Sequence, residues 1–192
     1  MEILLIIKEI IVVLSLLAGV VIAYFGLRTW NKQLKGTTKY KIAKNILIKT
    51  FKLRDEFSRA RAPFMSSAEM SNARDSEEDS NEDLSFRANI KRLNKLDDVK
   101  RELEVIRLEA DAVFGREETE EIQSLIDKVY EVNRSFNETQ EIKNKILNEE
   151  ERKIMKEVRS VLYGTGSAKD KFGQKIDTLV NEIEEKFKEY LK

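Results

Sequence analysis

The hydrophobic and polar positions divide the chain into one uninterrupted apolar run and a longer part of mixed character. Eighteen consecutive residues from Ile10 to Leu27 carry no charge. A helix of that length reaches ~27 Å, and the apolar turn Ile3–Ile7 extends it to the ~30 Å of a bilayer core. Aromatic residues follow at one predicted interface, at Tyr24, Phe25 and Trp30. The pattern predicts a transmembrane helix from about Ile3 to Leu27.

Two other interpretations of this run are weaker. A cleaved signal peptide has a basic start, a short apolar run and small residues at its exit, whereas this run is long, follows Glu2 and ends near Tyr24 and Phe25. A buried helix of a small soluble domain is rarely apolar on all sides over five turns. The run therefore favours an uncleaved anchor.

The residues after the run predict its orientation. No acidic residue occurs between Glu9 and Asp55, while many cations do. The positive-inside rule then places the carboxyl side in the cytoplasm and the amino terminus on the other side of the membrane. The cations nearest the anchor form a juxtamembrane basic patch that suits anionic headgroups, and its members are Arg28, Lys32, Lys35, Lys39, Lys41 and Lys44.

Beyond the anchor, apolar residues recur at spacings of three and four, which predicts helices. Gly36, with Thr37 and Thr38 as caps, predicts a joint before a helix over 39–62 that Pro63 ends. Further helices are predicted over 85–114, with Gly115 as a stop, over 117–163, with a break near Asn137, and from about Lys169 onward.

These elements predict an all-α fold: one transmembrane helix followed by an antiparallel bundle of about four cytoplasmic helices. The predicted parts are 1–35, anchor and juxtamembrane helix, and 36–192, the bundle. A long parallel coiled coil is the competing architecture, but strict heptads do not persist across Gly115 or Gly164. Residues 65–84 are rich in acids and poor in apolar side chains, so we expect a mobile acidic loop there.

The composition excludes much ordinary chemistry. The chain has no histidine and no cysteine, which removes the usual general base, thiolate nucleophiles and most metal-ligand sets. The run Gly164–Lys169 resembles a phosphate-binding loop only faintly, because its spacing is wrong and no strand precedes it, so it predicts a turn. We expect no catalytic residue, no cofactor and no metal.

One polar group near the end of the predicted helix 39–62 is a candidate site. Arg54 continues the apolar stripe of that helix, so we expect it to point partly inward and to need an anionic partner such as Asp55 or an acid on another helix. Arg59 and Arg61 follow within two turns. The group predicts a buried ion pair, with an anion-binding site as the alternative.

The residues from Trp30 to Phe64 also resemble a group of bacterial single-pass membrane proteins. The resemblance rests on W-x-x-Q-L-x-G after the anchor, then L-R-D at Leu53–Asp55 and R-x-P-F at Arg61–Phe64. Since that group has no established activity, the resemblance implies a bacterial or phage origin and a cytoplasmic helical domain, but no catalytic residues.

Together these patterns predict a non-enzymatic, membrane-anchored protein that acts as a protein-interaction or structural module. The expected partners are the lipid bilayer, anionic headgroups, and a protein partner or a second copy, but not nucleic acid. The alternative is an envelope-attached or phage spanin-like coiled coil whose helices lie outside the cytoplasm.

Overall fold

The computed structural model describes the backbone of residues 2–74, 80–142, 145–164 and 169–192, and the side chains of those residues from 14 onward except 81 and 82. Within these ranges every regular element is a helix and none is a strand. The predicted all-α class is therefore confirmed. Contacts group the chain into two compact units, 1–41 and 42–192, and the division falls inside the first helix.

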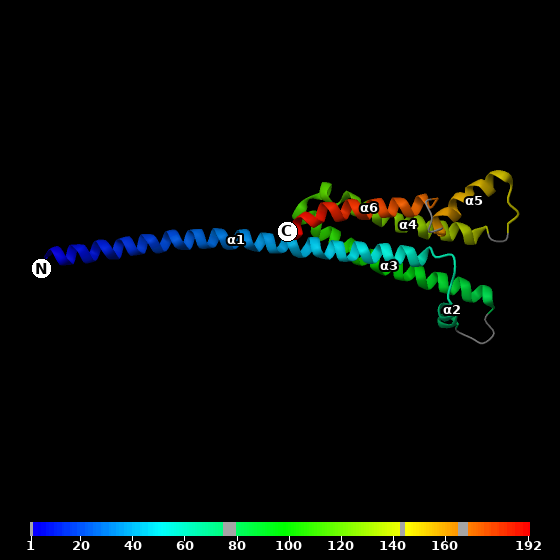
Figure 1. Ribbon diagram of the computed structural model, residues 1–192, viewed down its shortest axis with the longest axis horizontal. Helices are drawn as coiled ribbons and strands as arrows, with labels where there is room; N and C mark the ends of the chain where they lie inside the picture. The colour runs from blue at the N-terminus through cyan, green and yellow to red at the C-terminus, as the bar shows by residue number, and fades with distance from the viewer. Residues whose placement is uncertain (1, 75–79, 143–144, 165–168) are drawn as a thin grey trace. The chain divides into compact units, whose positions relative to one another are not determined.

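The elements follow one another along the chain with short connections (Figure 1). They are α1 (Glu2–Ala60), α2 (Ser67–Ala73), α3 (Asn81–Phe114), the 3-10 turn η1 (Arg116–Thr119), α4 (Glu120–Glu141), α5 (Glu149–Leu162), α6 (Lys171–Lys188) and the 3-10 turn η2 (Glu189–Leu191).

Helix α1 runs without interruption through the joint predicted at Gly36, so that prediction is wrong. Neither threonine caps a new helix. The Thr37 hydroxyl donates to the Gln33 carbonyl (2.9 Å) and the Thr38 hydroxyl to the Leu34 carbonyl (3.0 Å), one turn back in each case. A threonine bonded in this way stays compatible with the helix, and a single glycine costs only about 1 kcal/mol there.

In the first unit, the large apolar side chains of α1 are exposed on all sides. From Leu14 to Leu34 their exposed fractions run from 52% at Val21 to 71% at Ile22. No described side chain of 14–41 is buried. Such a surface is unlike the half-polar surface of a helix in a water-soluble domain.

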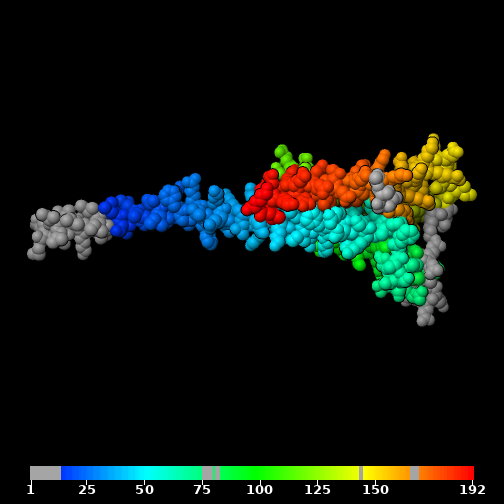
Figure 2. All heavy atoms as spheres, in the orientation of Figure 1, coloured from blue at the N-terminus to red at the C-terminus, as the bar shows by residue number. Residues whose placement is uncertain are grey.

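In the second unit, residues 42–60 of α1 share one apolar core with α3, α4 and α6. Helix α1 contributes side chains at three- and four-residue spacing, with exposed fractions of 7% or less. These are Ile42, Ala43, Ile46, Leu47, Leu53 and Phe57. Figure 2 shows α6, in orange to red, lying against this part of α1, in cyan. The spacing predicted from the sequence therefore marks the side of α1 that is buried.

The predicted stop at Gly115 is confirmed. Gly115 has φ 99°, a conformation that L side chains rarely adopt, and α3 ends immediately before it. The turn is held by Asp111, which accepts hydrogen bonds from Thr119 Oγ1 and, at 3.0 Å, from Arg107 Nη1. The chain is thereby reversed into η1 and α4.

Two boundaries differ from the sequence prediction. The break expected near Asn137 falls after Glu141, and α5 begins at Glu149, where the Asn148 side chain accepts from the Glu151 N–H. The region expected to be a loop over 65–84 contains the helix α2, and α3 begins within it; residues 75–79 of that prediction lie outside the described residues.

Helix α2 forms in the acidic region because its first turn is doubly capped. The Ser66 hydroxyl accepts from the Glu69 N–H, and the Glu69 carboxylate accepts from the Ser66 N–H at 2.9 Å. This reciprocal pair satisfies two donors that a helix start otherwise leaves free. A capping box thus stabilises seven helical residues where composition alone predicts a loop.

Candidate functional site

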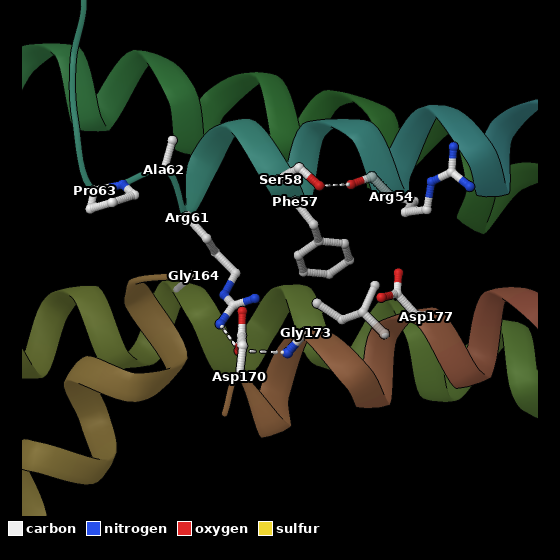
Figure 3. A pocket seen from close by; sticks show the side chains of 11 residues that line it. Arg54, Phe57, Ser58, Arg61, Ala62, Pro63, Gly164, Asp170, Gly173 and Asp177 are labelled. Atoms are coloured by element: carbon white, nitrogen blue, oxygen red, sulfur yellow. Dashed lines mark hydrogen bonds and ion pairs between the residues drawn. The ribbon is translucent and has the colours of Figure 1, made fainter. Parts of the chain in front are cut away.

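Arg61 forms the most buried ion pair among the described residues of the predicted site. It follows the last residue of α1, and only 5% of its side chain is exposed. Its Nη2 lies 2.7 Å from Asp170 Oδ1 and 3.1 Å from the Ser160 carbonyl, and its Nε donates to the Val161 carbonyl at 2.7 Å. Figure 3 shows the guanidinium pointing from α1 across to Asp170. A buried ion pair is thus present at one of the four predicted residues.

The surroundings of Arg61 explain why a cation lies there. Ser160 and Val161 are in the last turn of α5, where carbonyl groups lack partners within the helix and carry partial negative charge. Asp170 caps α6, because its Oδ1 also accepts from the Gly173 N–H at 2.9 Å. Arg61 therefore connects the end of α1 to the end of α5 and the start of α6.

The backbone around this ion pair leaves little space. A Cβ atom on Gly173 would lie 2.7 Å from Asp170 Oδ2, closer than real Cβ atoms come, and 3.2 Å from Arg61 Nη1, which is a tight contact. The Gly164 N–H donates to the Arg61 carbonyl at 2.8 Å, so the chain after α5 is also fixed to this point. The close approach of these segments therefore favours glycine at position 173.

A cavity of about 470 Å³ opens beside the ion pair, between the end of α1 and the start of α6 (Figure 3). Phe57 and Ile176 contribute to its apolar lining, and its polar groups besides the ion pair are Arg54, Ser58 and Asp177. The Ser58 hydroxyl already donates to the Arg54 carbonyl, at 3.2 Å. Since an added anion would have to compete with Asp170 and two carbonyls for Arg61, the geometry favours a structural ion pair over the anion site.

The other three predicted residues lie nearer the surface. Arg54 Nη2 pairs with Asp55 Oδ1 at 3.0 Å, with 43% and 58% of the two side chains exposed. Arg59 pairs with Glu56 at 2.8 Å and is 69% exposed. The predicted Arg54–Asp55 ion pair is therefore present, with Arg54 only half-buried. Neither Arg54 nor Arg59 contributes to the buried pair, because the core side of α1 passes through Leu53 and Phe57 and leaves both arginines beside it.

A second buried arginine, Arg92 of α3, was missed by the sequence analysis. It donates to the Ala62 carbonyl from Nη1 and to the Phe64 carbonyl from Nη2, both at 2.9 Å. It also binds both carboxylate oxygens of Glu69, at 3.0 and 2.9 Å. The connection from α1 to α2 is thus held by Arg61 on one side and by Arg92 on the other. In the sequence, the local signal for this contact is the Ser66-x-x-Glu69 capping pattern, because it predicts a helix start that fixes the Glu69 carboxylate near Arg92.

The Glu69 carboxylate is strongly acidic in the fold. Its hydrogen bonds from the Arg92 guanidinium and from the Ser66 N–H lower its pKa from 4.5 to about 2. Because the folded pKa lies below the ordinary value, Glu69 stabilises the fold above pH 4.5, and this contribution is lost as the pH falls towards 2.

We therefore expect Glu69→Gln to lower the free energy of unfolding near neutral pH by ~1 kcal/mol or less, because 41% of the Glu69 side chain is exposed and screened. The difference from the parent protein should shrink as the pH falls from 4.5 towards about 2. Urea unfolding of the full-length protein in detergent, at a series of pH values, measures it. A difference that stays constant below pH 4.5 would contradict the assigned contact.

The juxtamembrane basic patch lies along α1. All six of its residues are exposed. Because α1 is continuous, Arg28, Lys32, Lys35 and Lys39, at steps of four, three and four, share one side of the helix, whereas Lys41 and Lys44 do not continue that line. The structure thus aligns four of the six predicted cations.

Comparison of the chain with protein-family models, with curated proteins and with solved structures gives no match. One helix near the amino terminus is long and apolar enough to cross a membrane, and its apolar window is not buried in the fold. Functional inference therefore depends on the residues themselves.

Proposed function

We propose that the chain is a single-pass protein of a bacterial inner membrane, with its helical unit in the cytoplasm acting as a protein-interaction or structural module rather than as an enzyme. The observation that carries the proposal is that an apolar, exposed helix surface is followed along the chain by a run of cations without acids. The cations extend from Arg28 to Arg54, and the next acid is Asp55.

The exposed apolar surface of α1 supports the membrane location. In water, each large side chain left exposed forgoes about 1.5–3 kcal/mol of burial free energy, and α1 has many between Leu14 and Leu34. Lipid removes that cost. Tyr24, Phe25 and Trp30 then lie where aromatic residues favour a bilayer interface, and the line of cations from Arg28 to Lys39 lies beside anionic headgroups.

The polar contacts support a structural or interaction role. The two buried arginines are occupied in fastening helices together: Arg61 joins α1 to α5 and α6, and Arg92 joins α3 to α2. The buried Lys100 lies between Asp97 and Glu104 of its own helix, at 3.7 and 3.8 Å. A chain without histidine or cysteine also lacks the side chains that most often act as a base or nucleophile near neutral pH. An antiparallel bundle that presents one face to a partner protein or to a second copy fits these features best.

Reporter fusions at Lys192 test the location. A fluorescent protein fused there should fluoresce, and alkaline phosphatase fused there should be inactive, because the phosphatase folds only outside the cytoplasm. The opposite result would overturn the proposed orientation and favour the envelope-attached coiled coil. As a control, Arg28, Lys32, Lys35 and Lys39 are replaced together by glutamine, which should weaken the orientation preference if these cations set it.

Capture of the full-length protein from solubilised membranes, together with its sedimentation behaviour, tests the interaction role. We expect either a stoichiometric protein partner or self-association. A monodisperse monomer that retains no other protein would argue against an interaction module while leaving the membrane location intact.

A further inference from the structure

Helix α5 presents a line of cations on its exposed side. Arg152, Lys156 and Arg159 are separated by four and three residues, so they point in one direction from the helix. With Leu147 and Met155 they line a cavity of about 370 Å³. All three cations are exposed, while Met155 is 6% exposed and forms an apolar floor. Figure 2 shows α5, in yellow to orange, at the surface.

The three cations have no acidic partner within the described part of the chain. No ion pair joins any of them to a described carboxylate, and no acidic side chain lines the cavity. Glu151, one residue before Arg152, is used in the cap of α5, where its Oε2 accepts from the Asn148 N–H at 2.8 Å. The protein has equal numbers of acids and cations, 35 each, so this concentration of unneutralised charge is a local feature.

One of the three cations, Arg152, is fixed by a hydrogen bond to the backbone. The Arg152 Nε donates to the Leu147 carbonyl at 3.2 Å, which fixes that guanidinium beside the apolar floor. Arg159, in the last turn of α5, is favoured by the helix dipole, but like charges three or four residues apart on a helix repel each other, so the grouping of the three cations does not itself stabilise the fold. A complementary anionic surface would turn this repulsion into attraction.

The dimensions indicate what kind of anion fits. The seven helical steps from Arg152 to Arg159 cover ~10 Å along the helix, which is too long for one carboxylate or phosphate and suits a row of two or three. The apolar floor adds a requirement, since Met155 and Leu147 gain from contact with apolar atoms. A helix that carries carboxylates at three- and four-residue spacing, with apolar side chains alongside, meets both requirements.

We infer that the Arg152–Lys156–Arg159 side of α5 binds an acidic amphipathic helix of a partner protein. The inference rests on the proposed function as an interaction module and names the face and the chemistry of the partner. The cations select acidic sequences and speed association, and the Met155–Leu147 floor accepts the apolar side of the bound helix.

A synthetic peptide tests the inference directly. Its glutamates are spaced as the three cations are, with leucines alongside, and a second peptide carries glutamine in place of glutamate. Binding is measured by fluorescence anisotropy to the full-length protein in nanodiscs of neutral phosphatidylcholine. We expect the glutamate peptide to bind, the glutamine peptide to bind much more weakly, and the difference to fall with added salt.

Two matched variants locate the site. The triple variant R152Q/K156Q/R159Q should weaken binding about tenfold, whereas the control K32Q/K35Q/K39Q, which removes the same charge at similar spacing from α1, should change it less than about twofold. Circular dichroism checks folding of the triple variant. The single variant Lys156→Glu, at an exposed position, provides the same test if the triple variant is unstable.

Three results would overturn the inference. The first is an equal loss of glutamate-peptide binding in both triple variants, and the second is equal binding of the two peptides by the parent protein. The third is binding of inorganic tripolyphosphate to α5 without binding of the glutamate peptide. The last would identify a small-anion site instead. Each is distinguishable from failure of the proposed function, which is decided by the fusions, capture and sedimentation described above.

Discussion

Replacement of Arg61 by leucine should destabilise the helical unit by about 3–5 kcal/mol. The substitution leaves Asp170 as a partly buried carboxylate without its cation, and it removes the donors to the Ser160 and Val161 carbonyls. A domain of this size is commonly stable by about 5–15 kcal/mol, so the change removes a large share of the total. The measurement is urea unfolding of the full-length protein, followed by circular dichroism.

Two neighbouring arginines serve as controls for Arg61. Arg54→Leu and Arg59→Leu remove ion pairs whose arginine side chains are 43% and 69% exposed, against 5% for Arg61. Each control should cost ~1 kcal/mol or less. Equal losses in all three variants would show that position along α1, rather than the buried pair, decides stability. The double replacement Arg61→Leu with Asp170→Leu should recover part of the loss, because it also removes the carboxylate that pairs with Arg61.

Replacement of Phe57 by alanine should cost about 3–5 kcal/mol, because the ring is 1% exposed and the core cannot close the space it leaves. The matched control is Phe64→Ala, seven residues further along, where the same side chain is 85% exposed. We expect the control to stay within about 0.5 kcal/mol of the parent. Thermal and urea unfolding of the two variants measure the difference.

The Phe57 experiment also tests whether α1 belongs to the folded unit. If residues 42–60 were only a tether between the apolar segment and the remaining helices, both phenylalanine variants would behave like the parent. A large loss at Phe57 alone requires that this part of α1 packs in the same core as Leu103 and Ile183. The outcome separates an integral first helix from a linker.

The two buried arginines give the connection between α1 and α2 a defined role. Pro63 stops the helix, and the carbonyls on either side of it, from Ala62 and Phe64, accept from Arg92. Arg61 meanwhile turns towards α5 and α6. Several helices are therefore joined at the R-x-P-F motif, where the arginine forms the buried ion pair and the proline ends α1.

The sequence by itself determined the helical class and most helix positions, because these depend on local spacing. The stripe through Ile90, Leu93 and Leu96 marks α3, and Gly115 ends it with a positive φ that only the glycine accepts readily. The apolar run and the cations after Leu27 are likewise local signals. Two predictions failed where a side-chain hydrogen bond outweighed the general tendency of the sequence. The Thr37 and Thr38 hydroxyls bond to carbonyls within α1 rather than starting a new helix, and the Ser66–Glu69 capping box forms α2 where the acidic composition predicts a loop.

The tertiary structure alone decided which charges are buried and paired. Arg61 and Asp170 are 109 residues apart, and Arg92 and Glu69 lie on different helices, so spacing along the chain carries no record of either pair. Arg54 and Arg59 look equivalent to Arg61 in the sequence, yet Arg54 is only half-buried and Arg59 is exposed, because the core side of α1 passes between them. Helix periodicity fixes which side of a helix is apolar. Which residue pairs with a buried charge depends on how helices distant in the sequence pack together, and this packing is visible only in the tertiary structure.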